Sequence, residues 1–330
     1  MTIASKGESV KRSEDRRLIT GEGTYVDDVR LPGLLHVAFV RSPHAHALIR
    51  GIDVSAAAAA SGVQRVFTGA ELQEQLGSLP VGWVLPDQNS PSHPPLAFEK
   101  VRYVGDAVAA IVADSPYAAQ DATELVKVDY EPLEAVVDGE KATQADAPLL
   151  HEDAPDNTSF SWEVHSADHG YDDAAKDAEV VIKQRIRNQR LIPNSMEPRG
   201  IVADFNAGTD QITLWTSTQI PHLVRLLFSA VTGHPEHKVR VIAPDVGGAF
   251  GSKLYLYAEE VIMGMIAKNL KKPVKWIESR QENFIATTHG RDHIADAEIC
   301  GGKDGTITGF KVHVYANLGA YLSTFAPGIP

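Results

Sequence analysis

The sequence predicts a mixed fold of the α/β (α+β) class, and three observations support this prediction. Apolar runs of strand length alternate with stretches in which apolar residues recur at helical spacing. Gly- and Pro-rich segments separate these runs, as expected for turns and loops. The 330 residues are 43% hydrophobic and 22% charged, which is typical of a globular protein and leaves room for two domains.

The first hundred residues contain one clear strand. Residues 1–17 are polar and form a predicted lead-in without an apolar signal core. Residues 35–40 are almost continuously apolar, which predicts a strand buried on both faces. A Pro, Gly and Ser cluster at 77–97 predicts a long loop.

A strand–helix–strand unit is predicted next. The run AVAAIVA at 107–113 has the composition of a buried strand. Ser115 and Pro116 then fit the N-cap and the first position of a helix. Alternation at 126–130 predicts the second strand, so we expect a compact unit of the three elements.

The second half begins after an acidic stretch at 138–178 with little periodicity, so a domain boundary is predicted near residue 145. A strand at 211–216 is followed by a helix that starts at Pro221 and stops at Gly233. The expected apolar stripe of this helix comprises Leu223, Leu226, Leu227, Ala230 and Val231.

The remaining elements follow in quick succession. A strand at 239–243 leads through a glycine-rich turn to a helix at 258–269. The expected apolar stripe of that helix comprises Val261, Ile262, Met265 and Ile266. The last predicted elements are a strand at 273–277 and a hairpin that joins 295–300 to 306–316.

Charge and cysteine content exclude several classes of function. The formal net charge is −12 without a Lys/Arg stripe, so nucleic acid is not an expected partner. The one cysteine, Cys300, can form neither an internal disulfide nor an iron–sulfur cluster, and we expect it to be a buried, inert thiol. No apolar stretch approaches the length of a membrane span, and we expect a cytoplasmic location.

The glycine-rich turn at 245–253, DVGGAFGSK, is the first candidate site. Glycines between a strand and a helix let backbone N–H groups approach a ligand. The spacing fits neither the dinucleotide-binding pattern nor the P-loop. From the residues alone, a structural turn and a ligand-binding turn both remain open.

Gln219 is the second candidate, because it follows a predicted strand and can present its amide to a ligand. The alternative is that this segment only caps the next helix through Thr218. Two histidine pairs, His44 with His46 and His289 with His293, lack the further ligands of a metal site, so no metal ligands are assigned.

Several segments, in order along the chain, carry a resemblance to a known family. The first group is GEGTYVDD (21–28), LPGLLHVAFVRSPHAHALI (31–49) and VGDAVAAIVADSPYAAQDATELVKVDYEPL (104–133). The second is NSMEPRG (194–200), WTSTQIPH (215–222), HKVRVIAPDVGGAFGSK (237–253), KPVKWIESRQENF (272–284) and GAY (319–321). Together they resemble the molybdopterin-binding large subunit of the molybdenum hydroxylases, the xanthine dehydrogenase, aldehyde oxidase and aerobic carbon monoxide dehydrogenase family.

The resemblance implies a domain organisation. Residues 18–137 would form an α/β hammerhead domain, 138–150 a linker, and 151–330 part of the first molybdenum-cofactor-binding domain. Gln219 matches a glutamine whose amide approaches an oxygen ligand of molybdenum. Gly248, Ala249, Phe250 and Gly251 match a turn whose main chain contacts the cofactor.

Two positions depart from the family pattern. Ala249 replaces a glycine of the turn, which puts close approach at that position in doubt. Leu254 stands where purine-oxidising members carry a glutamate, so the resemblance favours the carbon monoxide dehydrogenase branch and the bacterial branch that oxidises aldehydes or N-heterocycles.

The implied activity is hydroxylation of an aldehyde or N-heterocycle, or oxidation of CO, with water as the oxygen source. The implied cofactor is molybdopterin with Mo, in its plain or cytosine dinucleotide form, and the presence of Cu is left open. Expected partners are a small 2Fe-2S subunit, a medium FAD subunit and the remaining half of the large subunit, assembled as a dimer of heterotrimers.

Length limits what this chain is expected to do alone. Family subunits are more than twice as long, and the glutamate that acts as general base lies outside the matching segments. The alternatives are therefore a truncated, inactive chain or a non-catalytic scaffold module of such a complex.

Overall fold

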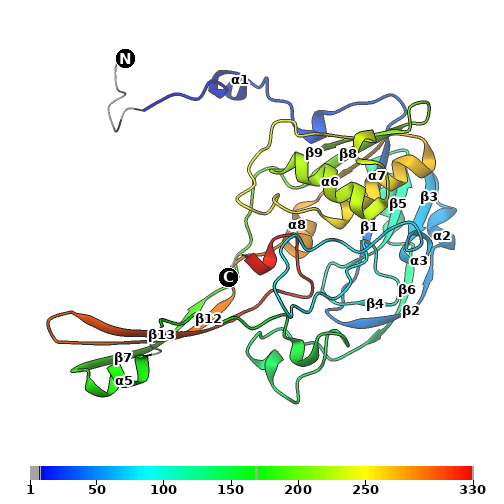
Figure 1. The fold of residues 1–330 in the computed structure, drawn as a ribbon. Helices are drawn as coiled ribbons and strands as arrows, with labels where there is room; N and C mark the ends of the chain where they lie inside the picture. Colours follow the sequence, from blue (N-terminus) through cyan, green and yellow to red (C-terminus); the bar gives the residue numbers. More distant parts are fainter. Residues whose placement is uncertain (1–6, 8, 168–169, 329–330) are drawn as a thin grey trace.

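The computed structural model describes residues 7, 9–167 and 170–328. The predicted lead-in, 1–17, therefore lies partly outside the described residues. Its described end contains a short helix, α1 (Asp15–Ile19), which stands apart from the body in Figure 1. The described residues contain no helix that is both long and apolar enough to cross a membrane.

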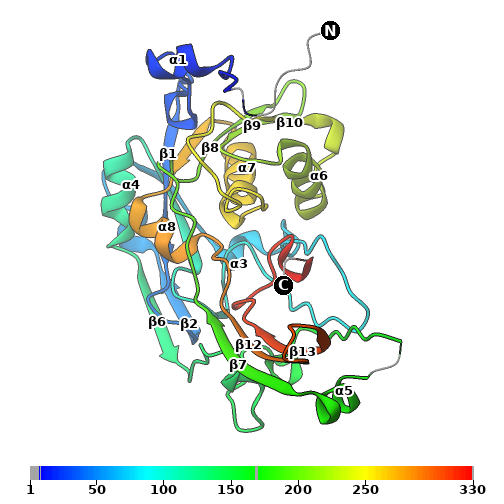
Figure 2. The same ribbon diagram turned by 90° about the vertical axis from the view of Figure 1, so that its left-hand side faces the viewer.

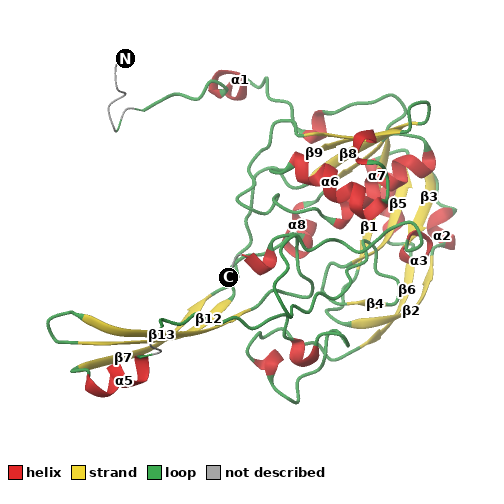
Figure 3. Cartoon of the chain, viewed as in Figure 1, coloured by secondary structure: helices red, strands yellow, loops and turns green. Residues whose placement is uncertain are grey.

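A mixed seven-stranded sheet forms the centre of the molecule (Figures 1 and 3). In spatial order its strands are β10 (Val239–Ile242), β9 (Gln211–Thr216), β8 (Gly200–Asn206), β11 (Val274–Ile277), β1 (Leu35–Arg41), β5 (Ala107–Ala113) and β3 (Val63–Thr68). Strands from the two halves of the sequence meet where β1 pairs in parallel with β11, in the register Leu35 to Val274. The two sequence regions therefore share one sheet.

Helices cover both faces of this sheet. On one face, α7 (Ala258–Leu270) packs on β8, β9 and β11, and α6 (Pro221–Thr232) packs on β10. On the other, α4 (Pro116–Thr123) packs on β1 and β5, as Figure 2 shows. The predicted cap of α4 is confirmed, because the Ser115 hydroxyl accepts a hydrogen bond from the N–H of Ala118 at 3.1 Å.

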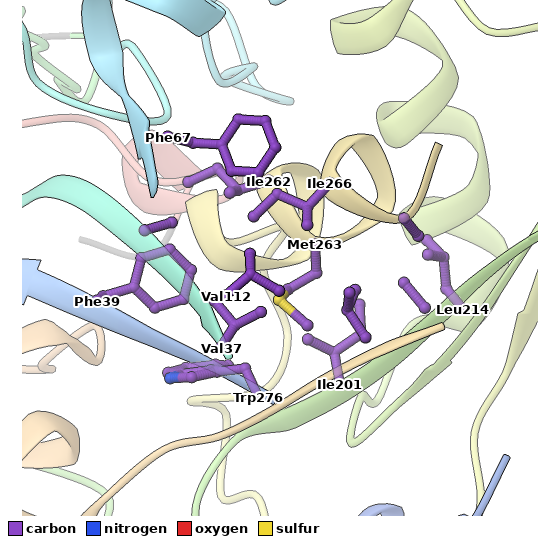
Figure 4. Close-up of a cluster of buried hydrophobic side chains, with 14 of the residues drawn as sticks. Val37, Phe39, Phe67, Val112, Ile201, Leu214, Ile262, Met263, Ile266 and Trp276 are labelled. Atoms are coloured by element: carbon purple, nitrogen blue, oxygen red, sulfur yellow. The ribbon is translucent and has the colours of Figure 1, made fainter. Parts of the chain in front are cut away.

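The largest core cluster lies between α7 and the sheet (Figure 4). Phe39 and Trp276 meet edge to face there, with ring centroids 5.5 Å apart. The predicted stripe of α7 is buried, but residues on its other sides, such as Met263 and Ala267, are buried too. Residues 259–267 of α7 are all buried, so the predicted one-sided stripe included too few of the buried residues.

The predicted stripe of α6 was wrong in phase. Leu223 and Leu226 are partly exposed, whereas Val224 and Phe228 are fully buried. The physical reason is a close approach to α7, where a side chain on Gly264 would lie 2.4 Å from the Phe228 ring. The predicted ends of α6 are confirmed, with Pro221 in its first turn and Gly233 at φ 67° as its C-cap.

A second, three-stranded sheet has the order β4-β2-β6. It comprises β4 (Lys100–Val101), β2 (Ala47–Asp53) and β6 (Lys127–Pro132). The three elements of the predicted strand–helix–strand unit are confirmed, and β5 and β6 lie in different sheets. The fully buried β5 needs cover on both faces, whereas β6 alternates between exposed and half-buried residues and suits an edge position.

The third sheet is a protruding arm with the strand order β13-β12-β7 (Figures 1 and 2). Its strands are β7 (Val180–Asn188), β12 (His293–Gly301) and β13 (Ile307–Ala316), and α5 (Tyr171–Asp177) packs on one face. The predicted hairpin is confirmed, since β12 and β13 pair antiparallel. The predictions missed β2, β3, β4, β7 and β8.

Short elements complete the chain and leave long irregular segments, including the predicted loop at 77–97. The helical ones are α2 (Ser55–Ala58), α3 (Gly69–Leu72), α8 (Arg280–Ala286), η1 (Val26–Asp28), η2 (Lys141–Thr143), η3 (Pro155–Asn157), η4 (Glu236–Lys238) and η5 (Ala326–Gly328).

Candidate functional site

The structure brings the two candidate segments together at one edge of the central sheet. Because β9 and β10 run parallel, the residues that follow them emerge at the same edge. The N–H of Gly251 donates to Oε1 of Gln219 at 3.2 Å, and the N–H of Gln219 donates to the carbonyl of Lys253 at 2.9 Å. Gln219 and the glycine-rich turn therefore form one local structure.

The backbone of the turn explains two of its glycines. Gly248 and Gly251 have φ values of 100° and 93°, which side chains rarely tolerate. Ala249 lies outside the left-handed region, so its methyl group causes no backbone strain. Phe250 has φ 51°, and its ring is 75% exposed. The replacement of a glycine by Ala249 is thus compatible with the fold of the turn.

Several donors at this turn point to no acceptor within the described part of the chain. The main-chain N–H groups of Gly248, Ala249 and Phe250 make no hydrogen bond to a described residue, and neither does Nε2 of Gln219. Unpaired donors on a glycine turn suit a ligand that carries oxygen or sulfur acceptors. The residues present therefore fit an anionic or metal–oxo group.

Glu197 binds the glycine-rich turn through its carboxylate, and the sequence analysis did not select this residue as a site candidate. Its carboxylate accepts hydrogen bonds from Ser217 Oγ at 2.6 Å, the N–H of Gly247 at 2.8 Å and Lys253 Nζ at 3.0 Å. Burial lowers the pKa of Lys253, and the hydrogen bond to Glu197 opposes this shift. The motif at 194–200 was visible in the sequence, but its contact with Lys253 was not.

Asp245 fixes the start of the turn. It forms an ion pair with Arg17 through both carboxylate oxygens and accepts the N–H of Thr24 at 2.9 Å. The Arg17 hydrogen bond, together with that from Thr24, lowers the pKa of Asp245 to about 2. The segment before the first predicted strand is therefore part of the support of the site.

A network of buried ion pairs lies in the interior near the site. Arg199 contacts Glu259 at 3.0 Å and Glu278 at 2.6 Å, and Arg41 contacts Glu259 at 2.8 Å. Burial alone would raise the pKa of Glu259, but the two guanidinium groups lower it to about 2. Since Arg41 ends β1 and Arg199 precedes β8, this network joins the two halves of the sequence.

Glu260, next to this network, behaves differently. Burial raises its pKa to about 7, although the hydroxyl of Thr216 donates to it at 2.6 Å. No cation pairs directly with Glu260 within the described residues. Two adjacent carboxyl groups on α7 thus titrate in opposite directions from their ordinary range.

The remaining candidates lie elsewhere. The alternative that Thr218 caps the next helix is wrong, because the N-cap residue of α6 is Ile220 and no side chain caps this helix; the Thr218 hydroxyl instead accepts the N–H of Ile220 at 3.2 Å in a local turn. His46 contacts the carbonyl of Glu134 at 2.8 Å. Among the residues described, no three His, Cys, Asp or Glu side chains are grouped as metal ligands. Cys300 is buried in the arm, as expected.

Comparison with known proteins identifies this architecture as that of a cofactor-binding protein. Residues 20–134 match the family described as "Aldehyde oxidase and xanthine dehydrogenase, a/b hammerhead domain". Residues 150–330 match "Molybdopterin cofactor-binding domain". The chain therefore belongs to the family of molybdopterin-binding large subunits of the molybdenum hydroxylases.

Two curated relatives illustrate the similarity. The chain is 39% identical over 315 residues to the nicotine 6-hydroxylase large subunit of Paenarthrobacter nicotinovorans, covering 96% of this chain and 38% of that subunit. It is 42% identical over 324 residues to the carbon monoxide dehydrogenase large chain of Afipia carboxidovorans, covering 94% and 39%. The chain thus spans about two fifths of the length of these relatives.

Solved structures share the fold. Reconstituted CO dehydrogenase from Oligotropha carboxidovorans superposes with a TM-score of 0.84 at 41% identity, covering 93% of this chain and 39% of that one. Quinoline 2-oxidoreductase from Pseudomonas putida 86 gives a TM-score of 0.84 at 36% identity, also covering 93% and 39%.

Proposed function

We propose that this chain forms the N-terminal part of the molybdenum-cofactor-binding large subunit of an oxidoreductase. The substrate class is an aldehyde, an N-heterocycle or CO, and water supplies the oxygen. The observation that carries the proposal is the contact between Gln219 and Gly251, which gathers unpaired donors at one sheet edge. Family membership supports molybdopterin as their ligand.

The residues of this chain bind and orient the cofactor in the proposed site. Nε2 of Gln219 would be available to donate to the bound cofactor, because Oε1 of the same amide is held by the N–H of Gly251. The N–H groups of Gly248 to Phe250 donate to the cofactor, and the missing side chain of Gly248 permits close approach. When bound, the molybdenum cofactor supplies the two-electron oxidation and activates water.

The complete activity requires components beyond these residues. We propose the remaining half of the large subunit, a small 2Fe-2S subunit and a medium FAD subunit as partners, in a cytoplasmic dimer of heterotrimers. The names of the relatives as large subunits support a multisubunit complex. The cytosine dinucleotide form of molybdopterin and the presence of Cu stay predictions, as does the division into domains at 18–137, 138–150 and 151–330.

Molybdenum content tests this proposal. We expect near-stoichiometric molybdenum in the complex purified from a host that makes the cofactor. In Gln219→Ala we expect a lower molybdenum content or a changed rate of substrate oxidation. Thr213→Ala, on β9 before the site, is the matched control and should behave like the unchanged protein. A folded complex without molybdenum would contradict the proposal and favour a non-catalytic scaffold. An unchanged rate and content in Gln219→Ala would remove Gln219 from the site.

A further inference from the structure

One buried ion pair connects every segment that forms the candidate site. The Glu197 carboxylate binds Gly247 at the start of the turn, Lys253 at its end, and Ser217 two residues before Gln219. Lys253 returns a second hydrogen bond, from Nζ to the carbonyl of Glu197, at 2.9 Å. No other side chain of the described residues makes hydrogen bonds to all three segments.

Lys253 also holds Gln219 through its backbone. Its carbonyl accepts the N–H of Gln219 at 2.9 Å and the hydroxyl of Thr218 at 3.3 Å. The position of the Gln219 main chain therefore follows that of Lys253, whose side chain is fixed by Glu197. A side chain on Gly247 would lie 2.5 Å from Cβ of Glu197, so the packing between turn and carboxylate is close.

The burial of this pair points to a geometric role. The side chain of Lys253 is 1% exposed and that of Glu197 is 18% exposed. Removing such a pair from water costs about as much as the attraction returns, and apolar residues of similar size often stabilise a fold equally well. Stability alone is therefore a weak reason for the pair, whereas a fixed spacing of three donors, one of them the lysine, around one carboxylate is a specific one.

We propose that the Glu197–Lys253 pair is the positioning element that sets the Gln219 amide against the glycine-rich turn. Neither side chain is among the donors assigned to the cofactor under the proposed function. The pair acts through the backbone of Lys253 and Gly247, and it keeps Gln219 Oε1 on the N–H of Gly251 so that Nε2 faces outward. This inference rests on the proposed function for its consequence, but its geometric part concerns this chain alone.

Hydrogen–deuterium exchange of residues 245–254 tests the geometric part without the cofactor. In Lys253→Met, we expect exchange of this segment to accelerate by roughly tenfold or more, the effect of losing a hydrogen bond to a charged group. Lys275→Met is the matched control, because Lys275 is equally buried and bonds Asp27, which makes no hydrogen bond to the turn. It should leave the exchange of 245–254 unchanged.

The double variant Glu197→Gln with Lys253→Met separates positioning from stability. It leaves no uncompensated buried charge, so the global unfolding midpoint should return toward that of the unchanged protein. Exchange of 245–254 should stay fast, because the pair is still absent. If the exchange rate of 245–254 and the unfolding midpoint both return to the values of the unchanged protein, the pair serves only stability and the proposal is wrong. Unchanged exchange in folded Lys253→Met would also overturn it.

Molybdenum content then tests the consequence. In the complex, the double variant should retain at most roughly a tenth of the molybdenum of the unchanged protein after gel filtration, as for a lost charged hydrogen bond, and Lys275→Met should retain it all. Full retention in the double variant would overturn the positioning role. If the unchanged complex holds no molybdenum, the proposed function fails, whereas the exchange result still decides the geometric part.

Discussion

The central sheet and the arm are built from similar strands but distribute their residues in opposite ways. In the central sheet, β5 is buried throughout, and charged residues beside the sheet are paired out of contact with water. In the arm, every residue of β7 is exposed. The arm carries its ion pairs in solvent, such as Arg185 with Asp296 at 2.9 Å.

The register of the arm separates apolar from charged residues. Ile182, Ile299 and Phe310 are cross-strand neighbours on one face, whereas Lys183, Glu298 and Lys311 are neighbours on the other. The central sheet is stabilised by side-chain burial on both faces. The arm is stabilised mainly by its backbone ladder and by α5. Equal substitutions should therefore have very different costs in the two regions.

The largest difference is expected for arginine. Arg199→Met leaves Glu259 and Glu278 buried without their shared cation, and we expect a loss of about 3–5 kcal/mol in unfolding free energy. Arg185→Met in the arm should cost much less, because its ion pairs are exposed to solvent. Urea unfolding of both variants provides the measurement. Equal costs would show that the central network is not a structural unit.

Aromatic residues provide the second comparison. Phe228→Ala removes a fully buried ring that packs on α7 and should cost about 3–5 kcal/mol. Phe310→Ala, where the ring is 63% exposed, should change unfolding free energy by about 0.5 kcal/mol or less. Thermal or urea unfolding distinguishes these values. A large cost for Phe310→Ala would mean that the arm has a packed core in solution.

The third comparison concerns pH. Burial raises the pKa of Glu260 from 4.5 to about 7, so its folded carboxyl binds a proton more tightly than the unfolded one. Its contribution to stability is complete below pH 4.5 and is lost as pH rises through 7. Glu260→Gln should remove this loss, which is on the order of 1–3 kcal/mol, in urea unfolding between pH 4.5 and 7.5.

Glu298 in the arm is the control for that experiment. The Lys183 and Tyr171 hydrogen bonds lower its pKa, so its contribution is present above the ordinary pKa and is lost as pH falls. Glu298→Gln should therefore leave the change between pH 4.5 and 7.5 nearly as it is. A pH dependence of unfolding that survives in Glu260→Gln would assign the effect to another group, such as Asp106, whose pKa burial also raises to about 7.

Substitutions in the short helices α4 and α5 should give the smallest difference in unfolding free energy between the central sheet and the arm. Ser115→Ala removes the side-chain cap of α4 on the central sheet and should cost about 1 kcal/mol. Lys176→Ala removes an exposed pair with Asp173 in α5 of the arm, and its effect should be about 0.3 kcal/mol. Differential scanning calorimetry can rank the two variants. The reverse order would contradict the comparison.

Local signals were sufficient to predict much of the central sheet. The apolar run of β5, the Ser115 cap of α4, and the Pro221 and Gly233 limits of α6 each act over a few residues, and each is confirmed. The phase of the α6 stripe was not predictable in this way. It depends on a contact with Gly264, which lies on another helix.

A partner far along the chain explains why β7 was missed. The edge strand β7 pairs with β12, more than a hundred residues later, and its alternation is interrupted by Lys183, Gln184 and Arg185. In the site, Gln219 and the glycine-rich turn were recognised separately, but only the parallel pairing of β9 and β10 brings them together. Glu197 lies in the motif at 194–200, which was recognised, but its contacts with Gly247 and Lys253 are tertiary and no local pattern predicts them. The roles of Gln219 and the turn stay predictions.

The parallel pair of β1 and β11 has a consequence for synthesis on the ribosome. Leu35 is made about 240 residues before its partner Val274, a delay of roughly 10–50 s at typical elongation rates. During that time one side of β1 has no strand beside it, and the half-finished sheet presents an open edge to other nascent chains. The yield of folded protein should therefore depend on translation speed and on chaperones that bind nascent chains at the ribosome exit.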